Sequence, residues 1–365
     1  MQKIKVGISH GDINGIGYEV ILKTFANEDI FQLCTPVLYG SPKVAAYYRK
    51  FVEDAPNFVV IDRPEKAKDG HLNIVDCFGD KELKIETGKP SQEAGEAAFN
   101  ALEKAVDDLR VQKIDVLVTA PINKNTIQRE NFRFPGHTEY IENKAGDGNQ
   151  SLMILMNEML RVALVTNHIP ISQISQKISK NIIETKLNIL NESLKVDFAI
   201  DNPRIAVLSL NPHCGDNGLI GAEEQDIIIP AIQDSFKKGI RCFGPYPADG
   251  FFGSGNYSKF DAILAMYHDQ GLAPFKALAM GDGVNYTAGL PVVRTSPAHG
   301  TAYDIAGQSI ADESSLRQAI FTAIDIYRNR EQYDVAYEKP LRKQYYEKKD
   351  DSDKLKLDQV TEEDI

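Results

Sequence analysis

Short apolar runs alternate with longer amphipathic stretches over most of the 365-residue chain. The runs are rich in Val, Ile and Leu, as is typical of buried parallel strands. Strand-like runs occupy residues 3–8, 36–39, 58–61 and 114–119. Helical spacing is found at residues 19–27, 43–51, 91–109, 181–194 and 223–238, with Ser91 as an expected N-cap. The alternation predicts an α/β protein whose parallel sheets are covered by helices on both faces. Its length suffices for two domains or one large one.

Four stretches depart from this pattern. Residues 62–90 are polar and irregular, while residues 246–256 and 281–294 are dense in Gly and other turn residues. We expect the last two to be functional loops rather than regular elements. Residues 331–365 are rich in Lys, Asp, Glu and Tyr and poor in aliphatic side chains, so a charged tail without a catalytic role is expected there.

Composition narrows the class of protein. The formal net charge of -11 argues against a surface for nucleic acid or anionic membranes. No apolar run approaches the roughly 18 residues of a membrane-spanning helix, and the first residues look like a strand rather than a signal peptide. The four cysteines are scattered and form no C-x-x-C pair, which fits a reducing compartment. A cytoplasmic protein with no nucleic-acid or membrane partner is expected.

Three of the seven histidines close an apolar, strand-like run: His168, His213 and His268. Ligands of open α/β sheets bind beyond the carboxyl ends of the strands, so three imidazoles at one such edge could hold a divalent metal and leave a position open for substrate. Any single histidine is more simply a polar residue at a strand end, but three in the same setting favour a metal site. Three aspartates lie near these histidines in sequence: Asp216, Asp249 and Asp269. Each could serve as a further metal ligand, as a hydrogen-bond partner of a ligand or as a proton acceptor.

A second set of residues suits an anionic substrate. His137 and Thr138 fall where a helix is expected to begin, and helix N-termini favour phosphate. Lys276 and Arg294 add cationic donors, while Asn285 is a weaker candidate. Taken singly, each charged residue is more simply a surface ion-pair partner. For a nucleotide, Gly11-Asp-Ile-Asn-Gly-Ile-Gly17 follows the first strand, but it matches neither a Rossmann fingerprint nor a Walker A loop and suggests a tight functional turn.

Together these motifs resemble the 4-hydroxythreonine-4-phosphate dehydrogenase family of pyridoxal phosphate biosynthesis. The resemblance covers nearly everything before the charged tail and rests on motifs spread along the chain. They are Gly11-Asp12, Asn-Pro-His213, Pro-Ala-Asp249, Tyr-His268-Asp-Gln-Gly, Pro-Phe-Lys276, Asn285, Gly-Leu-Pro-Val-Val-Arg294-Thr-Ser and His299-Gly-Thr-Ala-Tyr-Asp-Ile-Ala-Gly307.

The resemblance implies a two-domain α/β/α fold like that of isocitrate and isopropylmalate dehydrogenases. It implies a first domain of residues 1–130 and 300–330, and a second of residues 131–299 that carries the metal and substrate residues. It also implies a homodimer with the active site at the subunit interface. The metal ligands would be His168, His213 and His268. The substrate would be held by His137, Thr138, Lys276, Asn285 and Arg294. The run from His299 resembles an adenosine-binding loop, which implies cofactor contacts from His299, Gly300, Thr301 and Asp304.

The expected reaction is metal-dependent, NAD- or NADP-linked oxidation of 4-phosphooxy-L-threonine at C3, with decarboxylation to 3-amino-2-oxopropyl phosphate. The metal is expected to be Zn, Mg, Co or Ni, and imidazole ligands suit Zn, Ni and Co alike. Lys276, Asp249 and Asp269 are all candidate proton acceptors. The chain departs from the family's usual Gly-Asp-Pro-Ala-Gly-Ile-Gly-Pro-Glu opening by losing two prolines, which puts loop rigidity and the exact substrate in doubt. A dehydrogenase of a related phosphorylated four-carbon acid and a metal-dependent hydrolase of a phosphorylated metabolite are the alternatives. A structural zinc site is poorly supported.

Overall fold

A computed structural model of the chain describes residues 3–129, 132–279 and 281–338. The strands are β1 (Ile4–Ser9), β2 (Cys34–Gly40), β3 (Phe58–Ile61), β4 (Leu72–Asp76), β5 (Val116–Thr119), β6 (Leu152–Met156), β7 (Arg161–Leu164), β8 (Ile205–Leu208), β9 (Cys242–Tyr246), β10 (Ala262–Ala265), β11 (Val284–Ala288) and β12 (Val293–Pro297). The α-helices are α1 (Gly17–Thr24), α2 (Ile30–Leu33), α3 (Pro42–Tyr48), α4 (Gln92–Arg110), α5 (His137–Ala145), α6 (Ile174–Lys177), α7 (Lys180–Val196), α8 (Ile229–Lys237), α9 (Ala248–Gly253), α10 (His268–Leu278) and α11 (Ser314–Glu338).

All twelve strands of the described residues belong to one sheet, in the order β3-β4-β2-β1-β5-β12-β11-β6-β7-β10-β8-β9. The strands from β3 to β12 pair in parallel, as do those from β7 to β9. Antiparallel pairing is confined to the middle, where β11 joins β12 to β6 and β6 joins β7. The mixed α/β fold predicted from the sequence is confirmed, while the division into two domains stays a prediction.

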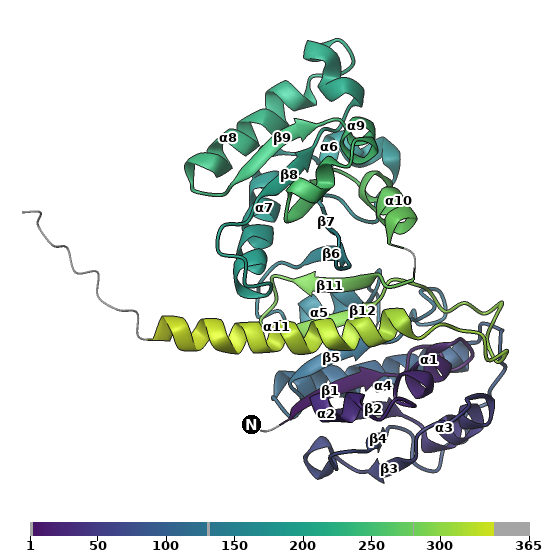
Figure 1. The fold of residues 1–365 in the computed structure, drawn as a ribbon. Helices are drawn as coiled ribbons and strands as arrows, with labels where there is room; N and C mark the ends of the chain where they lie inside the picture. The colour runs from purple at the N-terminus through teal and green to yellow at the C-terminus, as the bar shows by residue number, and fades with distance from the viewer. Residues whose placement is uncertain (1–2, 130–131, 280, 339–365) are drawn as a thin grey trace, which may run out of the picture.

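Helices cover both faces of this sheet, but they do so differently. On one face a continuous hydrophobic core runs under α1, α3, α7, α8 and α11, and the long helix α11 crosses the middle strands β5, β12 and β11 (Figure 1). On the other face there are two separate cores, one under α4 and α5 and one under α9 and α10. The site described below lies between these two cores.

Several elements differ from the expectation. Strand β4 lies inside the stretch expected to be irregular. The polar Asn73 breaks its apolar pattern in the sequence, but Asn73 is fully buried and its side-chain amide donates to the backbone carbonyl groups of Pro36, Lys68 and His71. Residues 281–294 contain β11 and the start of β12, and residues 246–256 contain α9, which buries Phe251. Thus three of the expected irregular segments contain regular structure.

The charged tail also begins later than expected, because α11 continues through Glu338. The rest of the expected tail, residues 339–365, lies outside the described residues. The N-cap prediction is confirmed: the Ser91 hydroxyl accepts a hydrogen bond from the Ala94 backbone N–H at 3.1 Å. Among the helices that the structure describes, none combines the length and apolar character needed to cross a bilayer.

Candidate active site

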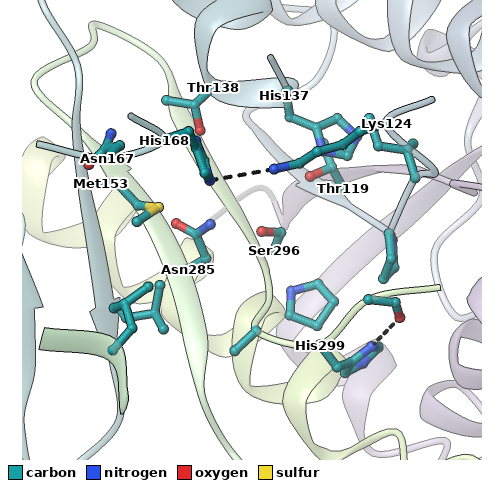
Figure 2. Close-up of a pocket in the computed structure, with 18 of the residues that line it drawn as sticks. Thr119, Lys124, His137, Thr138, Met153, Asn167, His168, Asn285, Ser296 and His299 are labelled. Carbon is teal, nitrogen blue, oxygen red and sulfur yellow. Dashed lines mark hydrogen bonds between the residues drawn. The ribbon is translucent and has the colours of Figure 1, made fainter. Parts of the chain in front are cut away.

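A cavity of about 240 Å³ is lined by residues of α5, α10 and the middle strands β6, β11 and β12 (Figure 2). Its wall is built from segments that are far apart in sequence. The residues that line it include all five candidate substrate residues, two of the three candidate metal ligands and the first two candidate cofactor residues. They are His137, Thr138, Lys276, Asn285, Arg294, His168, His268, His299 and Gly300.

Two helices begin at this cavity, and each begins with a histidine. His137 is the first residue of α5 and His268 is the first residue of α10. Backbone N–H groups at helix N-termini lack intrahelical partners and attract anions. Along α10, His268, Leu272 and Lys276 follow each other at four-residue spacing, so one face of the helix supplies all three to the cavity wall.

Arg294 anchors the anionic side of the cavity. Its side chain is 2% exposed, and its guanidinium donates to the hydroxyls of Thr119 (3.1 Å), Thr287 (3.2 Å) and Thr138 (3.5 Å). Burial lowers the pKa of Arg294 to about 10, and the nearby Glu139 opposes this shift. The side chain is therefore a cation at neutral pH that is held in place by neutral hydroxyl groups, which is the arrangement expected for an anion site.

Several buried polar atoms around the same cavity lack a hydrogen-bond partner. Within the described part of the chain, four enclosed polar atoms of lining residues have no hydrogen-bond partner: Nε2 of His137, Oδ1 of Asn167, Oδ1 of Asn285 and Nε2 of His299. Buried polar groups are normally paired, so such a cluster is typical of a site that receives a ligand. Burial, together with the positive charges of Arg294 and Lys124, holds the pKa of His137 well below its usual value, so its ring is neutral at neutral pH.

His168 and His268 face each other in this cavity, with ring centroids 5.7 Å apart. With metal–nitrogen distances of about 2.0–2.1 Å, two rings that share one tetrahedral ion lie roughly 5 Å apart at their centroids. Asp269 Oδ1 lies 2.7 Å from Nδ1 of His268, which leaves Nε2 to bind a metal. The pKa of His168 is lowered by burial and then by Lys124, whose Nζ lies 3.5 Å from Nε2 of the ring (Figure 2). The spacing of these two imidazole rings therefore fits one divalent cation.

His213 is not part of this arrangement. It is exposed and begins a run of six residues, His213 to Gly218, with positive φ angles between 44° and 94°. Within residues 3–129, 132–279 and 281–338, no three His, Cys, Asp or Glu side chains come close enough to hold one metal ion. A single copy of the chain thus brings together His168 and His268 but not the third candidate ligand.

The fold places some of the remaining candidate residues in or beside the cavity wall and others outside it. Of the proton acceptors, Lys276 lines the cavity and Asp269 contacts His268, whereas Asp249 lies on α9 outside the cavity wall. Of the cofactor residues, Thr301 and Asp304 lie outside the wall.

The segment that follows His299 packs against the glycine-rich loop after β1. The Thr301 carbonyl accepts from the Ile16 N–H at 3.1 Å, and the Tyr303 hydroxyl donates to Asp12 at 2.7 Å. A Cβ at Gly15 would lie 2.6 Å from the Thr301 carbonyl oxygen, so the glycines of this loop permit close packing.

Sequence reasoning missed five polar residues of the cavity wall, namely Thr119, Lys124, Glu139, Asn167 and Ser296. Three of them had a usable signal, because Lys124 follows a predicted strand, Glu139 directly follows Thr138, and Asn167 immediately precedes a candidate ligand. Thr119 and Ser296 had none, since a buried hydroxyl within a strand looks the same whether it supports the core or a site.

Taken together, the α/β sheet, the two helix N-termini and the buried cation are typical of an enzyme with a site for a small anion. The sequence profile of the family described as pyridoxal phosphate biosynthetic protein PdxA matches residues 32–323. The chain belongs to this family.

The most similar relatives carry two different names. The chain is 63% identical over 361 residues to the 4-hydroxythreonine-4-phosphate dehydrogenase of Bacteroides thetaiotaomicron, with 99% of both chains covered. It is 39% identical over 328 residues to the D-threonate 4-phosphate dehydrogenase of Cupriavidus necator, which covers 89% of this chain and 98% of that protein. The crystal structure of 4-hydroxythreonine-4-phosphate dehydrogenase from Klebsiella pneumoniae superposes with a TM-score of 0.77 at 32% identity, covering 90% of this chain and 98% of that one.

These comparisons confirm the family and the enzyme class predicted from the sequence. The chain is a dehydrogenase of a pyridoxal phosphate biosynthesis family. The hydrolase alternative loses its support, because the relatives that share the full length of the fold are named dehydrogenases.

Proposed function

We propose that the chain oxidises 4-phosphooxy-L-threonine at C3 with NAD or NADP and then releases CO2 to give 3-amino-2-oxopropyl phosphate. The observation that carries the proposal is the buried Arg294, bound by hydroxyl groups and next to the paired rings of His168 and His268. A substrate with a phosphate at one end and a hydroxyl and an amine in the middle suits both halves of this cavity. The 63% identity to a dehydrogenase named for this substrate supports the assignment.

In this proposal the phosphate binds at the start of α5. Arg294 supplies a charge-assisted, two-pronged donor, while His137 and Thr138 contribute their side chains and the unpaired backbone N–H groups of the first turn. Lys276 and Lys124 also line the cavity and add positive charge. Asn285, whose amide points toward the middle of the cavity in Figure 2, would orient the rest of the substrate.

The proposed metal ligands are His168 and His268 of one copy and His213 from a second copy of the chain. Two observations favour a donor from outside the protomer. His213 is exposed, and it belongs to no group of three candidate ligands close enough to share a metal ion within the described residues. Its neighbour Leu219 is 83% exposed, and Ile171, which lines a small cavity beside His168, is 78% exposed. Exposed apolar residues therefore lie near His213 and also near His168, and such surfaces are typical of a subunit interface.

A divalent ion such as Zn, Mg, Co or Ni would polarise the C3 oxygen and later the ketone of the β-keto acid. The nicotinamide would take up the hydride, and His299 and Gly300 are the proposed contacts to it from this cavity, with Thr301 and Asp304 further along the same segment. The hydroxyl proton needs an acceptor within hydrogen-bond reach. Lys276 is favoured because it lines the cavity, while Asp269 is better suited to orienting His268.

The reaction is tested by following absorbance at 340 nm with NAD or NADP, separately for 4-phosphooxy-L-threonine and D-threonate 4-phosphate. The second compound is the specific rival, because relatives named for it are also 37–39% identical to this chain. We expect faster turnover of 4-phosphooxy-L-threonine, with release of one CO2 per NADH. Turnover of D-threonate 4-phosphate alone would replace the substrate, and absence of NADH with both would refute the proposed reaction.

The shared metal site is tested by mixing inactive variants. If His213 acts in the other subunit, a dimer of His213→Ala with His168→Ala contains one intact site. Random mixing then restores about a quarter of wild-type activity, because half of the dimers are mixed and each has one working site of two. His168→Ala mixed with His268→Ala is the matched control and should stay inactive, since each of the two sites in the mixed dimer then lacks one ligand. Equal, near-zero activity in both mixtures would contradict the sharing of His213.

A further inference from the structure

The three histidine-bearing segments leave the sheet side by side, because β7, β10 and β8 are neighbouring strands. The β10–β8 ladder ends at the pair Leu264 and Val207. Two residues further on, in the same register, Met266 and Ser209 would face each other. The amide of Gln270 is inserted there instead: its Oε1 accepts from the Met266 N–H at 2.7 Å, and its Nε2 donates to the Ser209 carbonyl at 2.6 Å.

The inserted Gln270 side chain is buried, and its hydrogen bonds connect it to the third segment, which carries His168. Gln270 is 9% exposed and follows His268 by two residues in α10. Met266, which donates to Gln270, also accepts at its carbonyl from the Thr166 hydroxyl at 2.7 Å. Thr166 lies two residues before His168. One backbone unit, that of Met266, is therefore bonded on one side to the His168 segment and on the other, through Gln270, to the His213 segment.

The His213 segment is held at a second point by a buried carboxylate. Glu224 is 1% exposed, and it accepts from the N–H groups of Leu210 (2.8 Å) and Asn211 (2.7 Å). The Asn211 side chain also donates to Glu224 (2.9 Å) and to Glu223 (2.8 Å). These bonds fix the chain just before the left-handed run that starts at His213. Non-glycine residues with positive φ are strained, and such backbone persists only where the surrounding structure holds it in place. We therefore expect the shape of the left-handed run to depend on the hydrogen bonds that fix the residues just before it.

We propose that Gln270 is a positioning residue that sets where the His213 segment leaves the sheet relative to the His268 segment. This inference rests on the proposed function, in which both histidines bind a metal ion. Without the amide, the Met266 N–H and the Ser209 carbonyl would lose their partners in the interior, and the two strand ends would drift or admit water. Substrate-phosphate binding would be spared, because Gln270 makes no hydrogen bond to Arg294 or to α5.

The test compares Gln270→Leu with Asn73→Leu as matched control. Asn73 is an equally buried bridging amide, but it lies on β4, away from the cavity. Zn²⁺ affinity and inorganic phosphate affinity are measured by calorimetry, and amide hydrogen exchange is followed over residues 209–218. We expect Gln270→Leu to weaken Zn²⁺ binding about 10- to 100-fold, as loss of a residue that orients a ligand typically does. Phosphate affinity should stay within about threefold, and exchange over 209–218 should accelerate. Asn73→Leu should lower Tm without these changes.

Gln270→Glu gives a graded second variant in case Gln270→Leu does not fold. It keeps the acceptor for Met266 and places a second acceptor against the Ser209 carbonyl, so an intermediate loss of Zn²⁺ affinity is expected. Unchanged Zn²⁺ affinity and unchanged exchange over 209–218 in the folded Gln270 variants would overturn the proposal. A wild-type chain that binds no divalent ion would refute the metal part of the proposed function, while the exchange data would still decide the positioning role.

Discussion

His10 provides a test of the fold's electrostatics that needs no ligand. The residue is fully buried between Tyr18, at 5.1 Å between ring centroids, and Phe78, at 6.0 Å. Burial lowers its pKa from 6.5 to about 4. Because folding lowers this pKa, the unfolded chain binds the proton more tightly. The stability linked to neutral His10 is therefore fully present above pH 6.5 and is lost as the pH falls toward 4.

The expected magnitude follows from these two pKa values. Between pH 6.5 and pH 5 the unfolded chain takes up the proton and the folded chain does not, and at about 1.4 kcal/mol per pKa unit this costs about 2 kcal/mol. Urea denaturation of wild type and His10→Phe, followed by circular dichroism at pH 7 and pH 5, measures the difference. Wild type should lose about 2 kcal/mol more than the variant over this interval. His71→Gln, which removes an exposed histidine, is the control. Equal losses in wild type and His10→Phe would refute the assignment of a buried neutral ring.

Two further predictions concern the cavity and its support. Arg294→Lys keeps the charge but loses the guanidinium fork toward Thr119 and Thr287, so calorimetry should find inorganic phosphate bound about 10- to 100-fold more weakly; unchanged affinity would argue that the anion binds elsewhere. Gly95→Ala should destabilise the fold by about 1–3 kcal/mol, because a Cβ there would lie 2.1 Å from the Thr126 carbonyl oxygen, in the loop that follows Lys124. Gly253→Ala, where a Cβ meets nothing within 4 Å, is its control, and equal Tm values for the two variants would contradict the packing argument.

Local chemistry made much of the fold readable in the sequence. The Ser91 cap, the start of α5 at His137 and the strands that precede His168, His213 and His268 were all predicted from residue type and spacing. Two of the strands that were missed contain polar residues that make long-range contacts. Asn73 in β4 binds backbone, and Asn285 and Thr287 in β11 face the cavity or Arg294, so these strands look like loops when hydrophobic spacing alone is considered.

The alternation of strands and helices, the chemistry of the candidate residues and the family to which they point could be read from the chain alone, because these depend on residues close together in sequence. The tertiary structure alone decided which of those residues meet. Strand order brings the segment after β7 beside the segment after β10 and joins His168 to His268, whereas no third candidate ligand, His213 included, joins them within the described residues. Contacts between distant segments arise from the order and register of strands in the sheet, and no local pattern of side chains encodes that order.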